Sequence, residues 1–220
     1  MTKAREVFDQ RLKNLRDNII LMGEMVTTAV SLSIQALKEQ DVDLARQVVA
    51  RDEKINARRY DLEEECMKLI ATQQPAAGDL RAIIAANYIA TELERMGDYA
   101  AGIANLAIRL SDKPHLKPLI DLPRMGEIGR EMIKDSLTAY MKQDPDMALK
   151  IAKRDEEIDG LYDQIYRELL TYMMEDPKSI TRATYLLWAS HKLERIADRV
   201  TNISERVIFM ATGKFKELSF

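Results

Sequence analysis

Four pairs of oxygen-bearing side chains with a four-residue spacing are the residues of this chain best suited to chemistry. Residues four apart lie on one face of a helix, where two like charges destabilise it by roughly 0.2–0.5 kcal/mol unless something neutralises them. Carboxylate and amide oxygens bind hard or borderline cations such as magnesium, calcium, manganese or iron. The sequence therefore predicts divalent-metal sites at Asp52, Asn56, Glu94, Asp98, Asp155, Asp159, Glu194 and Asp198.

The alternative interpretation of these pairs is a solvated acidic face. Arg95 and Arg195 would then form ion pairs with the aspartates three residues further on. A single acidic pair would favour this interpretation, whereas two copies, each with a second pair at a matching position, favour metal. His191 lies on the same helix face as Glu194, and it is either an added ligand or a satisfied, partly buried histidine.

The acidic pairs belong to an internal duplication. Three segments recur in order, the first two with an offset of 103 residues and the third with an offset of 100: 22–24 as 125–127, 51–56 as 154–159, and 93–98 as 193–198. Chance matches would not keep both order and offset, so the chain consists of two similar units.

The elements that must position these pairs are long helices. Apolar residues at three- and four-residue steps predict six of them, at about 5–39, 44–72, 80–110, 124–143, 145–174 and 181–212. Short connections between such helices favour antiparallel packing. The predicted fold is all-α, with two tandem three-helix antiparallel bundles at 1–112 and 124–220 and a proline-containing linker at 113–123. Asp79 is expected to cap the third helix.

Composition excludes several classes of protein. The 220 residues are 46% hydrophobic and 31% charged, with 8 Gly and 6 Pro, which suits a helical protein and not an all-β fold. The net charge of −3 does not indicate the excess of basic residues that is typical of nucleic-acid-binding proteins. No signal peptide or membrane-spanning run is apparent, and Cys66 is the single cysteine, so a reducing cytoplasm is expected. Cys66 is interpreted as a small apolar residue of a helix and not as a reactive thiol.

With the repeat and these residues together, the chain resembles the PhoU family of phosphate-uptake regulators over nearly its full length. The resemblance rests on three stretches and their echoes in the second half: Arg51-Asp52-Glu53-Lys54-Ile55-Asn56, Gln73-Gln74-Pro75-Ala76 followed by Asp79-Leu80-Arg81, and Leu93-Glu94-Arg95-Met96-Gly97-Asp98.

The resemblance implies both a fold and a role. Family members are tandem three-helix bundles, and some carry iron or zinc clusters on acidic motifs at the eight positions named above. Asn56 departs from the motif and removes one charge from the first cluster. The implied role is repression of phosphate-starvation signalling and modulation of phosphate uptake. It would act through a membrane sensor histidine kinase and the ATPase of a phosphate ABC transporter, with the protein a homodimer that is peripheral to the membrane only through its partners.

Two rival functions stay open. No nucleophile with its base, phosphate-binding glycine loop or organic-cofactor fingerprint is present, which favours a non-enzymatic adaptor with no catalytic residues. A ferritin-like di-iron oxidase also uses carboxylates in a helical bundle, but it needs Glu-x-x-His on two helices, whereas this chain has only His191-Lys192-Leu193-Glu194. The second rival is a metal-free helical scaffold.

Overall fold

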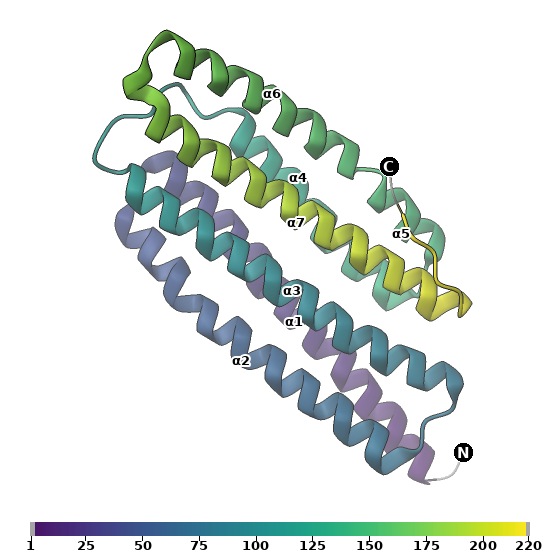
Figure 1. The fold of residues 1–220 in the computed structure, drawn as a ribbon. Coiled ribbons are helices and arrows are strands. Elements are labelled where there is room, and N and C mark those ends of the chain that lie inside the picture. The colour runs from purple at the N-terminus through teal and green to yellow at the C-terminus, as the bar shows by residue number, and fades with distance from the viewer. Residues whose placement is uncertain (1–2, 219–220) are drawn as a thin grey trace.

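Two bundles of antiparallel helices lie side by side in the structure, a computed structural model that describes residues 3–218 (Figure 1). No strand occurs in these described residues, and the predicted fold of two tandem three-helix bundles is confirmed. The first bundle contains α1 (Lys3–Glu39), α2 (Val42–Gln73) and α3 (Ala77–Leu110). The second contains α4 (Asp121–Lys142), α5 (Pro145–Ala152), α6 (Asp155–Glu175) and α7 (Ile180–Thr212), with a 3-10 turn, η1 (Pro177–Ser179), before α7.

Side-chain caps fix the start of two helices. The carboxylate of Asp41 accepts a hydrogen bond from the Leu44 backbone N–H at 2.9 Å, which satisfies one of the free donors of the first turn of α2. Asp144 caps α5 in the same way, and Pro145 follows at the first helical position, where its missing N–H is not needed.

The expected cap at Asp79 is wrong. Helix α3 begins at Ala77, its N-cap is Ala76, and no side chain caps it. The two alanines are strong helix formers, so the helix starts earlier than predicted and Asp79 falls inside its first turn. The carboxylate of Asp79 instead binds the guanidinium of Arg5 on α1, with the closest contact at 2.5 Å.

The single helix predicted at 145–174 is also wrong, because the chain breaks at Lys153 and Arg154 into α5 and α6. The Arg154 guanidinium binds two carboxylates of α4, Glu131 at 2.8 Å and Asp135 at 3.6 Å. The first repeat has Thr28 and Leu32 at the positions of these two acids, and its α2 is continuous. The break therefore coincides with ion-pair partners that only the second repeat possesses.

The duplication is visible in the contact between α1 and α4, which lie behind α3 and α7 in Figure 1. Gly23 of α1 lies against the Leu137 side chain of α4, and Gly126 of α4 lies against the Ile34 side chain of α1. Each glycine and its aliphatic neighbour exchange roles at the repeat offset of 103 residues. The two bundles thus pack about a pseudo-twofold axis, with a glycine allowing close approach on each side.

The contact between α3 and α7 follows the same pseudo-symmetry with different chemistry. Buried Glu92, 4% exposed, accepts hydrogen bonds from Arg199 at 3.4 Å and Asn202 at 3.1 Å. The counterpart of Glu92 is Lys192, whose Nζ lies 2.8 Å from the place a Cβ of Gly102 would occupy. One side of the axis therefore holds a buried ion pair, and the other holds an ammonium against a glycine.

Helix α1 is long and apolar enough to cross a membrane by length and composition, over Arg5–Glu39. More than half of its qualifying stretch is buried in the structure, as in the core helix of a bundle, and Ile19, Met22 and Val26 on it are fully buried. Cys66 is also buried, and burial, with Glu65 and Glu63 nearby, raises the pKa of its thiol to about 12. Its interpretation as a small apolar residue is consistent with this environment.

Candidate functional site

The second bundle brings its two predicted acidic pairs together. Asp155 is the first residue of α6 and Asp159 lies one turn later, while Glu194 and Asp198 lie on the adjacent helix α7. Burial, followed by the charges of Asp159, Asp198 and Glu194, raises the pKa of Asp155 to about 7. Burial and the charge of Asp198 likewise raise the pKa of Glu194 to about 7. The four carboxylates therefore form one repelling cluster without enough neighbouring cations to stabilise it.

Three of these carboxylates line one cavity of about 330 Å³, namely Asp155, Asp159 and Asp198. The Oδ1 atom of Asp155 is buried without a hydrogen-bond partner. Glu194 lies apart from the cavity lining, with its Oε2 atom 3.2 Å from Nδ1 of His191. The predicted local ion pair is present as well, since Arg195 Nη1 lies 2.9 Å from Asp198 Oδ2.

The first bundle holds a weaker version of the cluster between α2 and α3. Burial and the charge of Asp98 raise the pKa of Asp52, and the Asn56 amide opposes that rise by donating a hydrogen bond to Asp52 at 3.4 Å. Burial and Asp98 also raise the pKa of Glu94, while Arg59 and Arg95 lower it. The Oδ1 atoms of Asp52 and Asn56 are buried without hydrogen-bond partners.

A glycine controls how closely the two helices of the first cluster approach. A Cβ atom on Gly97 of α3 would lie 3.1 Å from Ile55 and 3.2 Å from the Oδ1 atom of Asp52. The second repeat has Ala197 at the corresponding position. The two clusters therefore differ in the residue at this helix contact as well as in charge.

The donor chemistry of both clusters suits a hard divalent cation, because buried oxygens of Asp52, Asn56 and Asp155 have no hydrogen-bond partner and the arginines nearby only partly offset the crowded carboxylates. Within residues 3–218, however, no group of three His, Cys, Asp or Glu side chains is placed so that it could hold one metal ion. The side chains fit a metal in charge and atom type, and they would have to turn toward a common point to bind it.

Sequence reasoning missed three features around the second cluster. Arg199, Thr201 and Asn202 of α7 line the same cavity as the acids, and Leu218 of the C-terminal segment completes the lining. Buried Glu92 of α3 binds Arg199 and Asn202. Glu92 lies on the apolar stripe of α3, but Arg95 three residues later is a possible local partner, so the spacing alone did not indicate a partner on another helix.

The fold and the site define a duplicated helical-bundle protein with one acidic cluster in each repeat. Comparison with protein families gives this class a name. The PhoU domain matches residues 19–107 and again residues 122–207, which is one match in each bundle. The chain belongs to the PhoU family.

Similar proteins match nearly the whole chain. A phosphate-specific transport system accessory protein PhoU homolog of Zymomonas mobilis is 42% identical, over 97% of this chain and 93% of that protein. The crystal structure of PhoU from Pseudomonas aeruginosa has a TM-score of 0.90 and 37% identity, over 94% of this chain and 100% of that one. The phosphate transport system regulatory protein PhoU from Streptococcus pneumoniae has a TM-score of 0.89 and 32% identity, over 96% and 100%.

Proposed function

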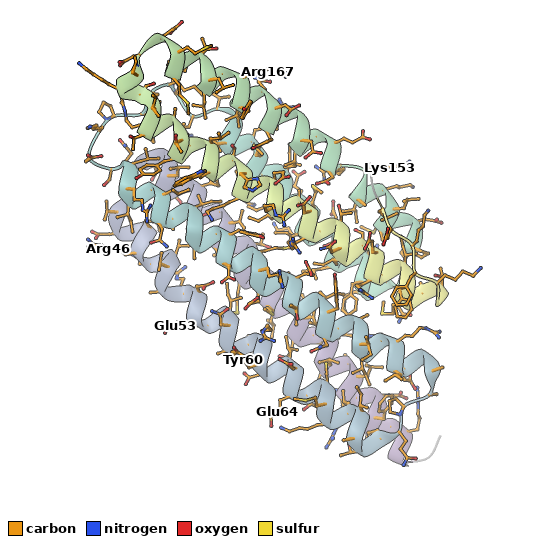
Figure 2. All side chains as sticks on the ribbon, in the orientation of Figure 1. Arg46, Glu53, Tyr60, Glu64, Lys153 and Arg167 are labelled. Carbon is orange, nitrogen blue, oxygen red and sulfur yellow. The ribbon has the colours of Figure 1, made fainter. Side chains whose placement is uncertain are left out.

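We propose that this protein regulates phosphate homeostasis as a non-enzymatic adaptor that represses phosphate-starvation signalling and modulates phosphate uptake. The observation that supports this most strongly is the match of both repeats to accessory and regulatory PhoU proteins over more than nine-tenths of the chain. Long rigid bundles with exposed charged side chains suit docking on other proteins. Figure 2 shows such side chains along the outer helices. Arg46 and Glu53 lie on α2, Lys153 lies between α5 and α6, and Arg167 lies on α6.

The proposed partners are a membrane sensor histidine kinase and the ATPase of a phosphate ABC transporter. The protein would work in the cytoplasm as a homodimer and reach the membrane only through these partners. The names of the relatives, which describe accessory and regulatory proteins of phosphate transport, support this assignment.

Deletion of the gene tests the proposed role. The deletion strain is expected to keep starvation-induced promoters active, or to import excess phosphate, in phosphate-rich medium. Complementation with the intact gene should restore repression. Normal repression and normal import in the deletion strain would reject the proposal.

The acidic clusters are proposed to bind iron, zinc or another divalent metal, the second cluster more strongly than the first. Asp155, Asp159, Glu194 and Asp198 provide four carboxylates, whereas the first cluster has Asn56 in place of one acid. A bound cation would supply the positive charge that these carboxylates lack and would join α6 to α7. At a free concentration one hundred times the dissociation constant, such binding stabilises the folded state by about 2.7 kcal/mol.

Two double variants test this asymmetry. Glu194→Ala with Asp198→Ala is expected to remove more bound metal, and more metal-dependent stabilisation, than Glu94→Ala with Asp98→Ala. Metal content is measured by elemental analysis before and after chelation, and stability by thermal unfolding with and without added metal. Equal losses would reject the asymmetry, and a content near zero in the intact protein would favour the metal-free scaffold.

The proximity of His191 to Glu194 is the one observation that favours an enzymatic alternative, a di-iron oxidase. That function needs a histidine on each of two helices, and the position of His191 in the first repeat is occupied by Thr91. Sustained oxygen consumption by iron-loaded protein supplied with ferrous iron would replace the adaptor proposal. The same assay on the Asp155→Asn variant is the matched control, because oxygen consumption that this variant retains would come from iron bound outside the second cluster.

A further inference from the structure

The face formed by α4, α1 and α2 contains two adjoining grooves that the acidic clusters do not use. The larger groove, of about 1130 Å³, lies between α1 and α4, and the smaller, of about 590 Å³, lies between α1 and α2. Both are lined by Leu21, Glu24 and Thr28, so these three residues of α1 form the ridge between them. We propose that the α1–α4 groove binds an amphipathic helix of a partner protein that has carboxylates along one edge, an inference that rests on the adaptor function proposed above.

Apolar side chains give the larger groove the character of a helix-binding site. Ile20 of α1 and Leu137 of α4 lie in it, and Gly23 beneath them brings the two helices close together. Leu21 and Met141 line the groove from opposite helices and remain 46% and 38% exposed. A helix laid between two packed helices buries such residues with its own apolar face, read at three- and four-residue steps.

The charges on this face determine the chemistry of the partner. Lys134 and Lys142 lie along the α4 wall of the larger groove, and Arg51 and Lys54 along the α2 wall of the smaller one. Among the described residues, none of these four cations has a carboxylate within ion-pair distance. The α1 wall carries Asp17 and Glu24, so the unpaired positive charge of this face is confined to its α4 and α2 walls. A row of carboxylates facing α4 would complement Lys134 and Lys142 and be drawn in by the cations of α2.

Shape decides between a helix and the other occupants of a cationic surface. A lipid bilayer is flat on this scale and would touch the rims while leaving the partly buried Ile20 in the groove uncovered. A second copy placed on the twofold axis would set one hollow against another, which leaves the apolar floors unfilled. A convex helix fills the groove and reaches both walls, as close packing requires.

Two designed peptides test the proposal on the full chain. Both carry one leucine face, and one has glutamates along a single edge where the other has lysines. Fluorescence anisotropy should show that the glutamate peptide binds at least about tenfold more tightly than the lysine peptide, and that Lys134→Glu with Lys142→Glu reverses this preference. The matched control is Lys150→Glu with Lys178→Glu, which makes the same change of charge at exposed lysines outside the grooves and should leave binding unchanged.

Three outcomes would overturn the proposal. One is equal binding, or no binding, of the two peptides. Another is binding to vesicles of anionic phospholipid that Lys134→Glu with Lys142→Glu abolishes while peptide binding is unaffected, which would assign the face to a membrane. The third is self-association, measured by sedimentation, that the same variant abolishes, which would assign the face to a second copy. A normal phosphate response in the deletion strain together with intact peptide binding would reject the regulatory function and leave the docking surface standing.

Discussion

Replacing Asp155 by asparagine should stabilise the metal-free protein at alkaline pH. The pKa of this carboxyl group rises from an ordinary value near 3.8 to about 7 because of burial first and three neighbouring carboxylates second. A group with a raised folded-state pKa favours folding while it is protonated. That contribution is complete below the unfolded pKa and is lost as the pH rises through the folded pKa. Asp155→Asn keeps the shape of the side chain and cannot acquire the charge.

The magnitude follows from the shift. The pKa of Asp155 rises from 3.8 to about 7, and each pH unit of that rise corresponds to about 1.4 kcal/mol. The free-energy penalty for charging this group in the folded protein is therefore at most about 4 kcal/mol. The Asp155 side chain is only half-buried, so water screens part of this penalty and about half of it is expected to remain. The natural protein loses this stability between about pH 4 and about pH 7, the unfolded and folded pKa values of the group. The free energy of unfolding of Asp155→Asn, relative to that of the natural protein, should therefore increase by about 1–2 kcal/mol between pH 5 and pH 8.

Urea unfolding followed by circular dichroism, on protein stripped of metal with a chelator, measures this difference. Asp52→Asn is the matched control in the first repeat, where the corresponding carboxyl group faces Asp98 and is relieved by the Asn56 amide, so its pH dependence should be smaller. An advantage of Asp155→Asn that does not change with pH, or a natural protein that is more stable than Asp155→Asn at pH 8, would refute the reasoning. Adding a divalent metal should reverse the sign, because the charged carboxylate then has a partner.

Two further predictions concern the contacts between the bundles. Gly126→Ala should destabilise the protein by about 1–3 kcal/mol, since the new methyl group meets the stiff, β-branched Ile34 at 2.8 Å. Gly23→Ala should cost less, because the Leu137 methyl group that it meets can rotate toward the open groove; a larger cost for Gly23→Ala in urea unfolding would contradict this. Glu92→Ala should cost about 1–3 kcal/mol because it leaves the partly buried Arg199 and Asn202 without their acceptor, and a change below 1 kcal/mol in the same assay would show that water already solvates these groups.

The sequence predicted the helices well because their signals are local. Apolar periodicity depends on residues within a turn or two, as do the observed caps at Asp41 and Asp144, and the structure has helices where this periodicity predicts them. The errors lie where distant residues decide. The break before α6 accompanies the ion pairs of Arg154 with carboxylates of α4, and the loss of the expected Asp79 cap accompanies an ion pair with α1. Neither contact has a signature in the neighbouring sequence.

The acidic pairs were only partly predictable for the same reason. The four-residue spacing placed each pair on one helix face, and the duplication indicated that the pairs of neighbouring helices would meet, as they do across α6 and α7. Spacing along a helix says nothing about rotamers, so the turn of Glu194 toward His191 and away from the cavity could not be anticipated. The participation of Arg199 and Leu218 depends on the packing of α3 and of the C-terminal segment.

Comparison of the two repeats distinguishes contacts that both copies share from contacts that only one copy makes. Between the bundles, the glycines at 23 and 126 and their aliphatic neighbours have kept matching roles. Around the acids the repeats differ: Asn56, Tyr99, Ala101 and Gly102 of the first correspond to Asp159, Arg199, Thr201 and Asn202 of the second. The glycine contacts between α1 and α4 match in the two copies, whereas the contact between α3 and α7 differs, because Arg199 and Asn202 beside the second cluster bind Glu92 of the other bundle. The divergence around the acids therefore extends to the contact between the bundles, and the polar cavity at α6 and α7 makes the second repeat the one in which to look first for a ligand.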